Sequence, residues 1–345
     1  MKIAVLNNCV PFLRGGAEHL AEALVAKFEE YGHQACLVKV PFRWDPPQAI
    51  LESMLACRLL RLANVDLAIG LKFPAYYIQH DNKRIWLLHQ FRQAYDLWGT
   101  PYQGLPSNDE GIRIREVIRR ADGLHLGAVD RIWANSEVTA SRLYRHNHLS
   151  AEVLYAPLLS TGHFRTEQYG DSVCAIGRVN ETKRQLLAVQ SMAYVKSSVK
   201  LIVAGHIESS GLRRQLTDTI REYGLNNKVT VLDRFISEEE KVGLLARALA
   251  SVYIPYDEDS YGYVTLESYL SKKPVITCRD SGDTKVLVRH EETGLSVAPK
   301  PRDLAKCMDR LYEDKTYAQR LGEAGYRRAL ELNISWDRVV RELTA

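Results

Sequence analysis

Three acidic residues and a glycine precede a predicted helix in the stretch Asp257–Glu267. The apolar run 250–254 predicts a buried strand, and the residues from about Tyr263 onward predict a helix. Backbone N–H groups at a helix N-terminus suit a phosphate, and Gly262 lets a ligand come close to the main chain. Since acidic side chains repel a phosphate, they are better explained as acceptors for sugar hydroxyls on either side of it. The stretch therefore indicates a nucleotide sugar.

Two cations, Arg178 and Lys183, follow another predicted strand, 172–176. A guanidinium offers a forked pair of donors and a lysine a mobile point charge, which together suit a diphosphate. Two solvated surface cations would have the same spacing, but the position directly after a strand favours binding.

Two features of the first half allow both a functional and a structural interpretation. Gly15 and Gly16 join the first predicted strand to a helix, where the backbone can approach an anion, although a plain tight turn would look the same. No G-x-G-x-x-G is present. His89 ends the predicted strand 84–88 and could contact a reacting sugar or move a proton, or be a structural histidine.

The acids Asp257–Asp259 spell D-x-D, a pattern that holds a divalent metal in some transferases. A diphosphate already served by a helix N-terminus, Arg178 and Lys183 needs no metal. We therefore expect neither a metal nor any other cofactor.

The chain lacks the signatures of several other enzyme classes. GxSxG, HExxH, Walker A and zinc-like Cys/His spacings are absent, which argues against a serine hydrolase, a zinc peptidase and a P-loop enzyme. The 46 basic and 42 acidic residues give a net charge of +4, too weak to indicate a nucleic-acid partner.

Composition and apolar patterning favour a cytoplasmic location. The six cysteines form no CxxC pair, so reduced thiols are expected. The chain begins with a predicted strand, 2–6, so we expect no signal peptide. No apolar run reaches the length of a membrane span, and peripheral contact with the inner face of a membrane stays open.

A length of 345 residues predicts about two domains, and strands alternate with helices throughout. Periodicity disappears over 157–170, where we place the linker, and the long loop 90–107 is a candidate substrate-contacting segment. Such alternation predicts parallel sheets covered by helices, with ligands bound beyond the carboxyl ends of the strands. The predicted strands are 2–6, 35–40, 65–70, 84–88, 131–134, 153–156, 172–176, 200–204, 228–232, 250–254, 275–278 and 295–297; the predicted helices are 17–31, 48–62, 109–125, 136–146, 185–194, 212–223, 237–248, 263–270, 302–312, 317–332 and 335–343.

Together these residues resemble glycosyltransferase family 4, part of the glycosyl transferases group 1, whose members are retaining enzymes of GT-B fold. The second half resembles the family almost throughout and the first half more loosely. No single motif is specific, but their combination in this order is. The matching segments are Gly15–Glu18, Asn135–Ser136, Gly177–Lys183, Asp259–Glu267, Lys273–Thr277 and Glu292–Leu295.

The resemblance implies an α/β GT-B fold, with two doubly wound Rossmann-like domains facing a central cleft. The N-terminal domain, 1–160, would bind the acceptor, and the C-terminal domain, 161–332, the nucleotide-sugar donor. The last helix, about 333–345, would pack back on the first domain.

The resemblance also implies residue roles. Arg178 and Lys183 would hold the donor diphosphate, Glu267 the ribose hydroxyls and Asp259 the donor sugar. The implied catalytic residues are His89, Arg178, Lys183 and Asp259. The implied donor-binding residues are Gly15, Gly16, Arg178, Lys183, His206, Arg234, Phe235, Ile236, Asp259, Tyr261, Gly262, Tyr263, Val264, Thr265 and Glu267. The diphosphate would depart from the same face of the sugar that the acceptor attacks, and the departing phosphate would take the proton of the acceptor hydroxyl.

Two positions depart from the family pattern. Asp259 stands where the family usually has Glu, which leaves the donor sugar open, and Val286 stands where an acid is common. We expect a metal-independent transferase that moves a hexosyl unit from a UDP-sugar, with UDP-glucose the first candidate, to a glycan or lipid-linked acceptor in polysaccharide or glycolipid biosynthesis. The alternatives are a nucleotide-sugar epimerase of similar fold and a non-catalytic nucleotide-sugar-binding subunit.

Overall fold

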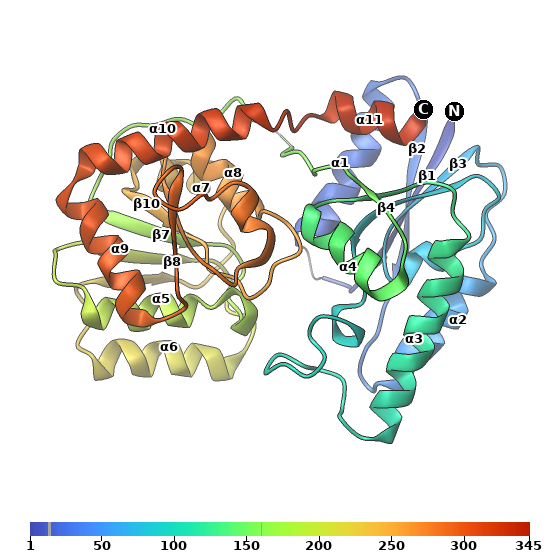
Figure 1. The fold of residues 1–345 in the computed structure, drawn as a ribbon, viewed down its shortest axis with the longest axis horizontal. Coiled ribbons are helices and arrows are strands. Elements are labelled where there is room, and N and C mark those ends of the chain that lie inside the picture. The colour runs from blue at the N-terminus through green and yellow to red at the C-terminus, as the bar shows by residue number, and fades with distance from the viewer. Residues whose placement is uncertain (13–14, 160) are drawn as a thin grey trace. The chain divides into compact units, whose positions relative to one another are not determined.

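The computed structural model describes residues 1–12, 15–159 and 161–345. Residues 13 and 14 of the predicted loop 7–16, and residue 160 at the predicted domain boundary, lie outside the described residues. The chain divides into two compact units, Met1–Leu159 with Ile334–Ala345, and Ser160–Asn333. Each unit is built on one parallel six-stranded sheet (Figure 1).

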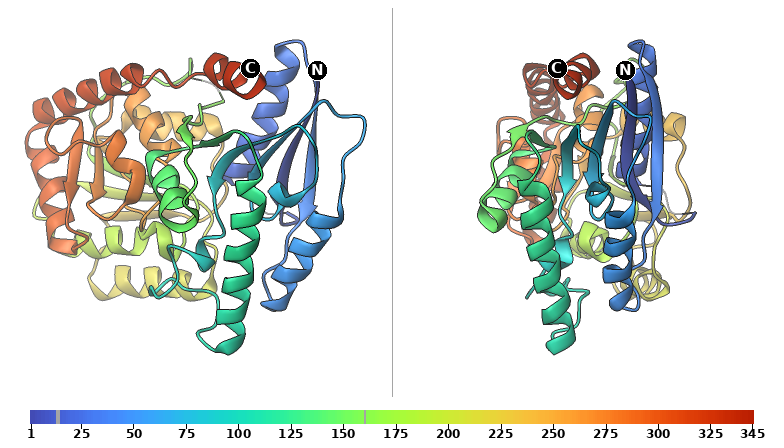
Figure 2. Two further views of the ribbon diagram at one scale, coloured as in Figure 1. Left: turned by 45° about the vertical axis from the view of Figure 1, so that its right-hand side comes forward. Right: turned by 90° about the vertical axis from the view of Figure 1, so that its right-hand side faces the viewer.

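The sheet of the first unit has the order β2-β1-β3-β4-β5-β6. Its strands are β1 (Lys2–Cys9), β2 (Gln34–Pro41), β3 (Leu67–Lys72), β4 (Lys83–His89), β5 (Ile132–Ala134) and β6 (Glu152–Val153). Its helices are α1 (Gly16–Glu30), α2 (Gln48–Leu59), α3 (Asp109–Gly127) and α4 (Glu137–Asn147). Helices α2 and α3 lie side by side, as both figures show (Figures 1 and 2), and their apolar residues form one core with Ala4, Leu6, Ile85 and Leu87 of the sheet.

The sheet of the second unit has the order β12-β11-β10-β7-β8-β9. Its strands are β7 (Ser172–Ile176), β8 (Lys200–Ala204), β9 (Val229–Leu232), β10 (Ala250–Val252), β11 (Val275–Cys278) and β12 (Gly294–Val297). Its helices are α5 (Gln185–Ser191), α6 (Ser210–Glu222), α7 (Glu238–Arg247), α8 (Tyr263–Leu270), α9 (Pro301–Glu313) and α10 (Lys315–Glu331).

Both faces of this second sheet are covered by helices. Val173 and Ala175 of β7 pack with apolar residues of α5, α6 and α9. The alternate residues Cys174 and Ile176 pack with residues of α7 and α8 on the opposite face. Alternation along a strand therefore places apolar side chains in two layers, which explains the continuous apolar run in the sequence.

Strand β7 is the point where the strand order of the second sheet reverses. It pairs with β8 on one side and with β10 on the other. The connections that leave the carboxyl ends of β7 and β10 therefore diverge, and open α/β sheets bind ligands at such a position.

The last helix, α11 (Trp336–Thr344), belongs to the first unit and packs against α1. The indole of Trp336 donates to the carbonyl of Leu158 at 2.8 Å. The guanidinium of Arg84 in β4 donates to the carbonyl of Leu343 at 2.7 Å. Side-chain donors thus hold both ends of the helix.

The structure corrects several predicted element boundaries. β1 continues to Cys9, so the predicted loop 7–16 begins later, and α2 ends at Leu59 rather than at residue 62. The predicted strand 153–156 is reduced to Glu152–Val153, and the strand predicted to reach residue 254 ends at Val252. Five 3₁₀ turns were not predicted because three to five residues are too short to show a period: Ala75–Tyr77, Arg92–Ala94, Glu181–Lys183, Met192–Tyr194 and Gly282–Val286.

Within the part of the chain that the structure describes, no helix has the length and apolar character needed to cross a bilayer. In the same described residues, no group of three or more His, Cys, Asp or Glu side chains is placed to hold a metal ion.

Candidate functional site

Most of the predicted site residues lie at the carboxyl edge of the second sheet. Arg178 follows β7, His206 follows β8 and Arg234 follows β9, while the stretch from Asp259 to Glu267 follows β10. These four strands are neighbours in the order β10-β7-β8-β9 and run parallel, so the residues after them share one edge. Gly15, Gly16 and His89 belong to the first unit.

Gly262 ends the acidic loop and is the residue that precedes α8. Its φ of 74° lies in the left-handed region that glycine adopts freely. A Cβ atom here would lie 2.2 Å from Cε1 of Tyr253. The ring of Tyr253 therefore packs directly against the entrance to α8, and only glycine allows this approach.

The first turn of α8 carries a buried polar group with nothing bound to it. Thr265 is completely buried, and its hydroxyl has no hydrogen-bond partner among the described residues. A buried hydroxyl without a partner is costly and rare. Together with the backbone N–H groups of the helix N-terminus, it can bind an oxygen-rich ligand.

Lys183 lies at the hydroxyl end of the Tyr253 side chain. Its ammonium donates to the hydroxyl of Tyr253 at 2.9 Å and forms an ion pair with the carboxylate of Glu258. Only 21% of the Lys183 side chain and 17% of the Glu258 side chain are exposed. Burial acts to lower the pKa of Lys183, but the charge of Glu258 and the hydrogen bonds to Glu258 and Tyr253 outweigh it and raise that pKa. The lysine is therefore held as a cation.

Arg184 fixes the loops that follow β10 and β11. Its guanidinium donates to the carbonyls of Ile254 at 2.7 Å and Pro255 at 2.9 Å, and it forms a two-pronged ion pair with Asp280 at 2.7 and 2.8 Å. Arg184 has a φ of 56°, in the left-handed region that side chains rarely adopt. One residue with a strained backbone thus links the loops that follow β10 and β11.

A second glycine, Gly282, packs against the acidic loop. Its φ is 67°, and a Cβ atom there would lie 2.1 Å from the carbonyl oxygen of Glu258. The N–H of Asp283 donates to the same oxygen at 3.1 Å. The segment that departs from the family pattern at Val286 therefore supports the acidic loop through its backbone, and Asp259 in that loop is buried.

Arg178 is half exposed and pairs with Glu208. Its guanidinium lies 2.7 Å from one oxygen of Glu208, while the amide of Asn180 donates to the other at 2.9 Å. Asn180 also accepts from the N–H of Lys183 at 3.0 Å through its side chain. The short 3₁₀ turn between the two predicted cations is therefore capped by one asparagine, which sets the position of both.

The residues predicted to lie near a nucleotide base are exposed. His206 lies 3.7 Å from Asp233, and Arg234 pairs with Glu240 at 2.5 Å. Phe235 exposes 78% of its surface, an unusual state for a large apolar side chain, whereas Ile236 is partly buried against α7. An exposed aromatic ring next to an arginine can stack on a base.

Glu267 occupies the second turn of α8 and is buried, with 7% of its side chain exposed. Its Oε1 atom accepts from the ammonium of Lys241 in α7 at 2.5 Å. Burial raises the pKa of the Glu267 carboxyl, and the nearby charge of Lys241 opposes that effect. A buried carboxylate aligned with the α8 N-terminus is suited to accept hydrogen bonds from sugar hydroxyls.

In the first unit, Gly15 immediately precedes α1, and Gly16 is its first residue. The carboxylate of Glu18 accepts from the N–H of Gly15 at 2.9 Å and pairs with Lys72 at 2.7 Å. Burial acts to raise the pKa of Glu18, but the charge of Lys72 and the hydrogen bonds outweigh it and lower that pKa. Glu18 of the sequence motif therefore shapes the turn rather than facing a ligand.

His89 ends β4, as the sequence indicated, and is partly exposed. Its Nδ1 atom donates to the carbonyl oxygen of Gln90 at 2.7 Å, because a carbonyl oxygen can only accept.

The loop 90–107 is more tightly packed than the sequence indicated. Tyr95 is buried, and its hydroxyl donates to the buried carboxylate of Asp122 at 2.7 Å. Tyr76 and Tyr77 donate to the other oxygen of Asp122 at 2.8 and 2.6 Å. Tyr95 therefore has a structural role in the loop that the sequence marked as a candidate substrate-contacting segment.

Reasoning from the sequence alone missed three residues of the candidate site and one pairing: Tyr253, Arg184, Lys241 and the ion pair of Glu258. Tyr253 lies in the predicted strand 250–254 and Arg184 directly precedes the predicted helix 185–194, and neither carried a spacing signal of its own. Lys241 lies in an ordinary polar helix, where a charge is normally solvated. One hint was present in the sequence: a further cation, Arg184, directly follows Lys183.

A known family model matches most of the second unit. The family model described as "Glycosyl transferases group 1" matches residues 167–328. An alpha-1,3/1,6-mannosyltransferase, ALG2, of Dictyostelium discoideum is 26% identical over 244 residues, which cover 59% of this chain and 57% of that protein. A D-inositol 3-phosphate glycosyltransferase of Salinispora tropica is 26% identical over 198 residues, which cover 54% and 40%. The chain thus spans about half the length of the curated relatives it matches.

Solved structures resemble the chain over its whole length. The Anabaena protein Alr3699/HepE, in complex with UDP and glucose, has a TM-score of 0.73 at 17% identity and covers 100% of this chain and 99% of its own. Sucrose-phosphate synthase (tll1590) from Thermosynechococcus elongatus has a TM-score of 0.78 at 18% identity and covers 99% and 97%. At these identities the likeness shows the fold.

Proposed function

We propose that the chain transfers a sugar from a nucleotide sugar, because residues 167–328 match the family model of the glycosyl transferases group 1 and the chain has a GT-B fold. The proposed reaction is retaining and moves a hexosyl unit from a UDP-sugar, with UDP-glucose the first donor to test. The proposed acceptor is a glycan or a lipid-linked intermediate of polysaccharide or glycolipid biosynthesis, used in the cytoplasm or at the inner face of a membrane.

One observation supports the donor site most strongly. The hydroxyl of Tyr253 accepts a hydrogen bond from the ammonium of Lys183, and the same end of the ring packs against the backbone of Gly262. It thereby brings a held cation next to the N-terminus of α8, at the strand where the sheet order reverses. A cation, the backbone N–H groups at the start of α8 and the unpartnered hydroxyl of Thr265 together suit a diphosphate.

The remaining donor contacts follow from the same arrangement. In the proposal, Arg178 and Lys183 bind the diphosphate, helped by the backbone of residues 261–265. Glu267 accepts hydrogen bonds from the ribose, and Asp259 from the transferred sugar. His206 and the exposed segment 234–236 contact the base. The similarity to a protein solved with UDP and glucose favours uridine as that base.

Catalysis in this proposal is electrostatic. Negative charge develops on the departing diphosphate, so a fixed cation and N–H donors stabilise the transition state more than the bound donor. The leaving phosphate takes the proton of the acceptor hydroxyl. No residue has to act as a nucleophile, and the proposal requires no metal. We assign acceptor binding to the first unit.

A binding and turnover screen tests the proposal. Purified protein would be titrated with UDP-glucose, UDP-galactose, UDP-GlcNAc and GDP-mannose, and sugar release into water would be followed by nuclear magnetic resonance. We expect micromolar binding of one UDP-sugar and slow release of a sugar with retained configuration. Binding of none of the four would refute the proposal. Release of a sugar inverted at C2 would indicate an epimerase, and binding without turnover in the presence of acceptor extracts would indicate a non-catalytic subunit.

A further inference from the structure

The carboxylate of Glu267 is the centre of a chain of charged side chains that runs out of the proposed donor site. Its Oε1 atom is 2.5 Å from the ammonium of Lys241. The same ammonium is 2.7 Å from Oε2 of Glu238, one turn earlier in α7. Oε1 of Glu238 is in turn 3.1 Å from Nε2 of His163 in the segment before β7.

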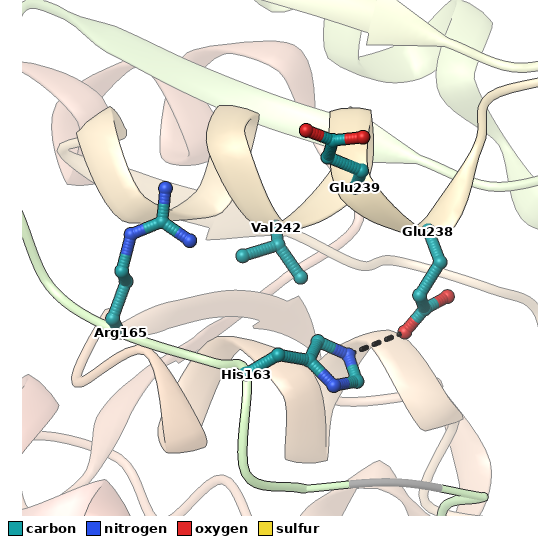
Figure 3. Close-up of a pocket in the computed structure, with 5 residues that line it drawn as sticks. All are labelled: His163, Arg165, Glu238, Glu239 and Val242. Carbon is teal, nitrogen blue, oxygen red and sulfur yellow. Dashed lines mark hydrogen bonds and ion pairs between the residues drawn. The ribbon is translucent and has the colours of Figure 1, made fainter.

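The members of this chain differ in their exposure to solvent. Only 7% of the Glu267 side chain and 18% of the Lys241 side chain are exposed, whereas Glu238 is 55% exposed. His163 and Glu238 line a hollow of about 210 Å³ together with Arg165, Glu239 and Val242 (Figure 3). The hollow therefore opens on the solvent end of the chain, and the buried end is the ion pair between Lys241 and Glu267.

One oxygen of Glu267 has no partner in the protein. Lys241 occupies Oε1, and among residues 1–12, 15–159 and 161–345 no hydrogen bond to Oε2 is formed. A charged carboxylate that is held at one oxygen presents the other in a fixed direction. Lys241 itself is held by a second carboxylate and by the ring of Phe164, whose centroid is 6.0 Å from the ammonium.

We propose that Lys241 is a positioning residue for the nucleotide: it fixes one oxygen of Glu267 so that the other accepts a hydrogen bond from a ribose hydroxyl. This inference rests on the proposed function, because it requires a nucleotide at α8. Lys241 touches no substrate and acts only through Glu267. Selection for a ribose with both hydroxyls then depends on an ion pair formed between two helices, α7 and α8.

The ionisation of Glu267 supplies an independent readout. The titratable and charged groups that face it are Lys241 and Glu238 of α7, His163 of the preceding segment and Tyr263 of α8. Burial raises the pKa of Glu267, and Lys241 is the strongest opposing influence. Removing the lysine removes the main influence that opposes burial, so the carboxylate is lost at a higher pH as the solution is acidified.

The test compares UDP with its 2′-deoxy and 3′-deoxy analogues by calorimetric titration. For the wild type we expect UDP to bind about 10-fold or more tightly than at least one analogue, the ratio typical of one hydrogen bond to a charged group. In Lys241→Met this ratio should fall to about 3-fold or less, while the affinity for that analogue stays unchanged. Lys241→Arg should keep the ratio, and Lys315→Met, which breaks an exposed pair with Asp171, should change nothing.

Two further measurements separate positioning from a merely structural role. In a Glu267→Gln background, Lys241→Met should have no further effect on the ratio. As the solution is acidified, the affinity ratio of UDP to the analogue should also fall at a higher pH in Lys241→Met than in the wild type. If UDP and its analogues lose affinity equally in Lys241→Met, or if the ratio survives, the positioning role is refuted. If the wild type binds no nucleotide at all, the proposed function fails instead.

Discussion

Because Lys183 is paired with Glu258, we predict that a change of Glu258 alters the affinity for the donor nucleotide. The ammonium that we assign to the donor diphosphate already has a carboxylate partner, and both side chains are mostly covered. A diphosphate must therefore compete with Glu258 for the same donor. We expect Glu258→Gln to bind UDP more tightly than the wild type, although it removes a polar contact of the site.

The size of the effect follows from the competing interaction. A hydrogen bond to a charged group contributes about 1.5 kcal/mol or more, and giving one up costs a comparable amount, so its removal should improve UDP affinity by about 10-fold. Coulomb repulsion between Glu258 and the diphosphate acts in the same direction. The matched variant Lys183→Met should weaken UDP binding by about 10-fold or more, because it removes the cation itself.

Calorimetric titration with UDP at fixed ionic strength measures both variants, with circular dichroism to check folding. Asp171→Asn, which removes the acid of an exposed pair with Lys315, is the control and should leave the affinity unchanged. Weaker UDP binding by Glu258→Gln would show that Glu258 supports the ligand rather than competing with it. Equal affinity in Lys183→Met and the wild type would remove Lys183 from the site.

Three further predictions concern stability, backbone geometry and metal dependence. Burial raises the pKa of Asp122 from 3.8 to about 6, so this group stabilises the fold most below pH 4 and the contribution is lost as pH rises through 6. Asp122→Asn should remove this pH dependence of the free energy of unfolding, which amounts to up to about 3 kcal/mol when measured by urea titration. A variant whose pH profile equals that of the wild type would contradict the prediction. Gly262→Ala should weaken UDP binding by about 10-fold or more by displacing Tyr253, whereas Gly224→Ala, with a φ of 62° and open space around it, should not. EDTA should leave turnover of a UDP-sugar intact; loss of turnover that magnesium restores would instead place a divalent ion at Asp257–Asp259.

Much of the fold could be predicted because the pattern of each element is local. β7, β8 and β11 begin and end where the apolar runs 172–176, 200–204 and 275–278 predict. Both faces of these strands are covered, so the run is continuous and its ends are sharp. Boundaries were less well predicted where a turn follows without a polar signal, as at Val252 and Leu59.

The candidate site was predictable only in part. The positions of Arg178, Lys183 and the stretch up to Glu267 follow from their places after strands, since parallel strands end at one edge of a sheet. Their partners lie far apart in the chain: Lys183 meets Glu258, and Arg184 meets Asp280. A spacing rule cannot reveal such pairs, because they form between loops of different strands.

The sequence by itself determined the fold class, the edge of the sheet where the candidate site residues lie and the kinds of group found there. Side-chain type and periodicity are sufficient for this, since they decide which segments are buried and where strands end. Only the tertiary structure shows which charged side chains form ion pairs. Glu258 pairs with Lys183, Lys241 pairs with Glu267, and the ring of Tyr253 packs against Gly262. The strength of an ion pair depends on distance and burial, and both are properties of the packed chain.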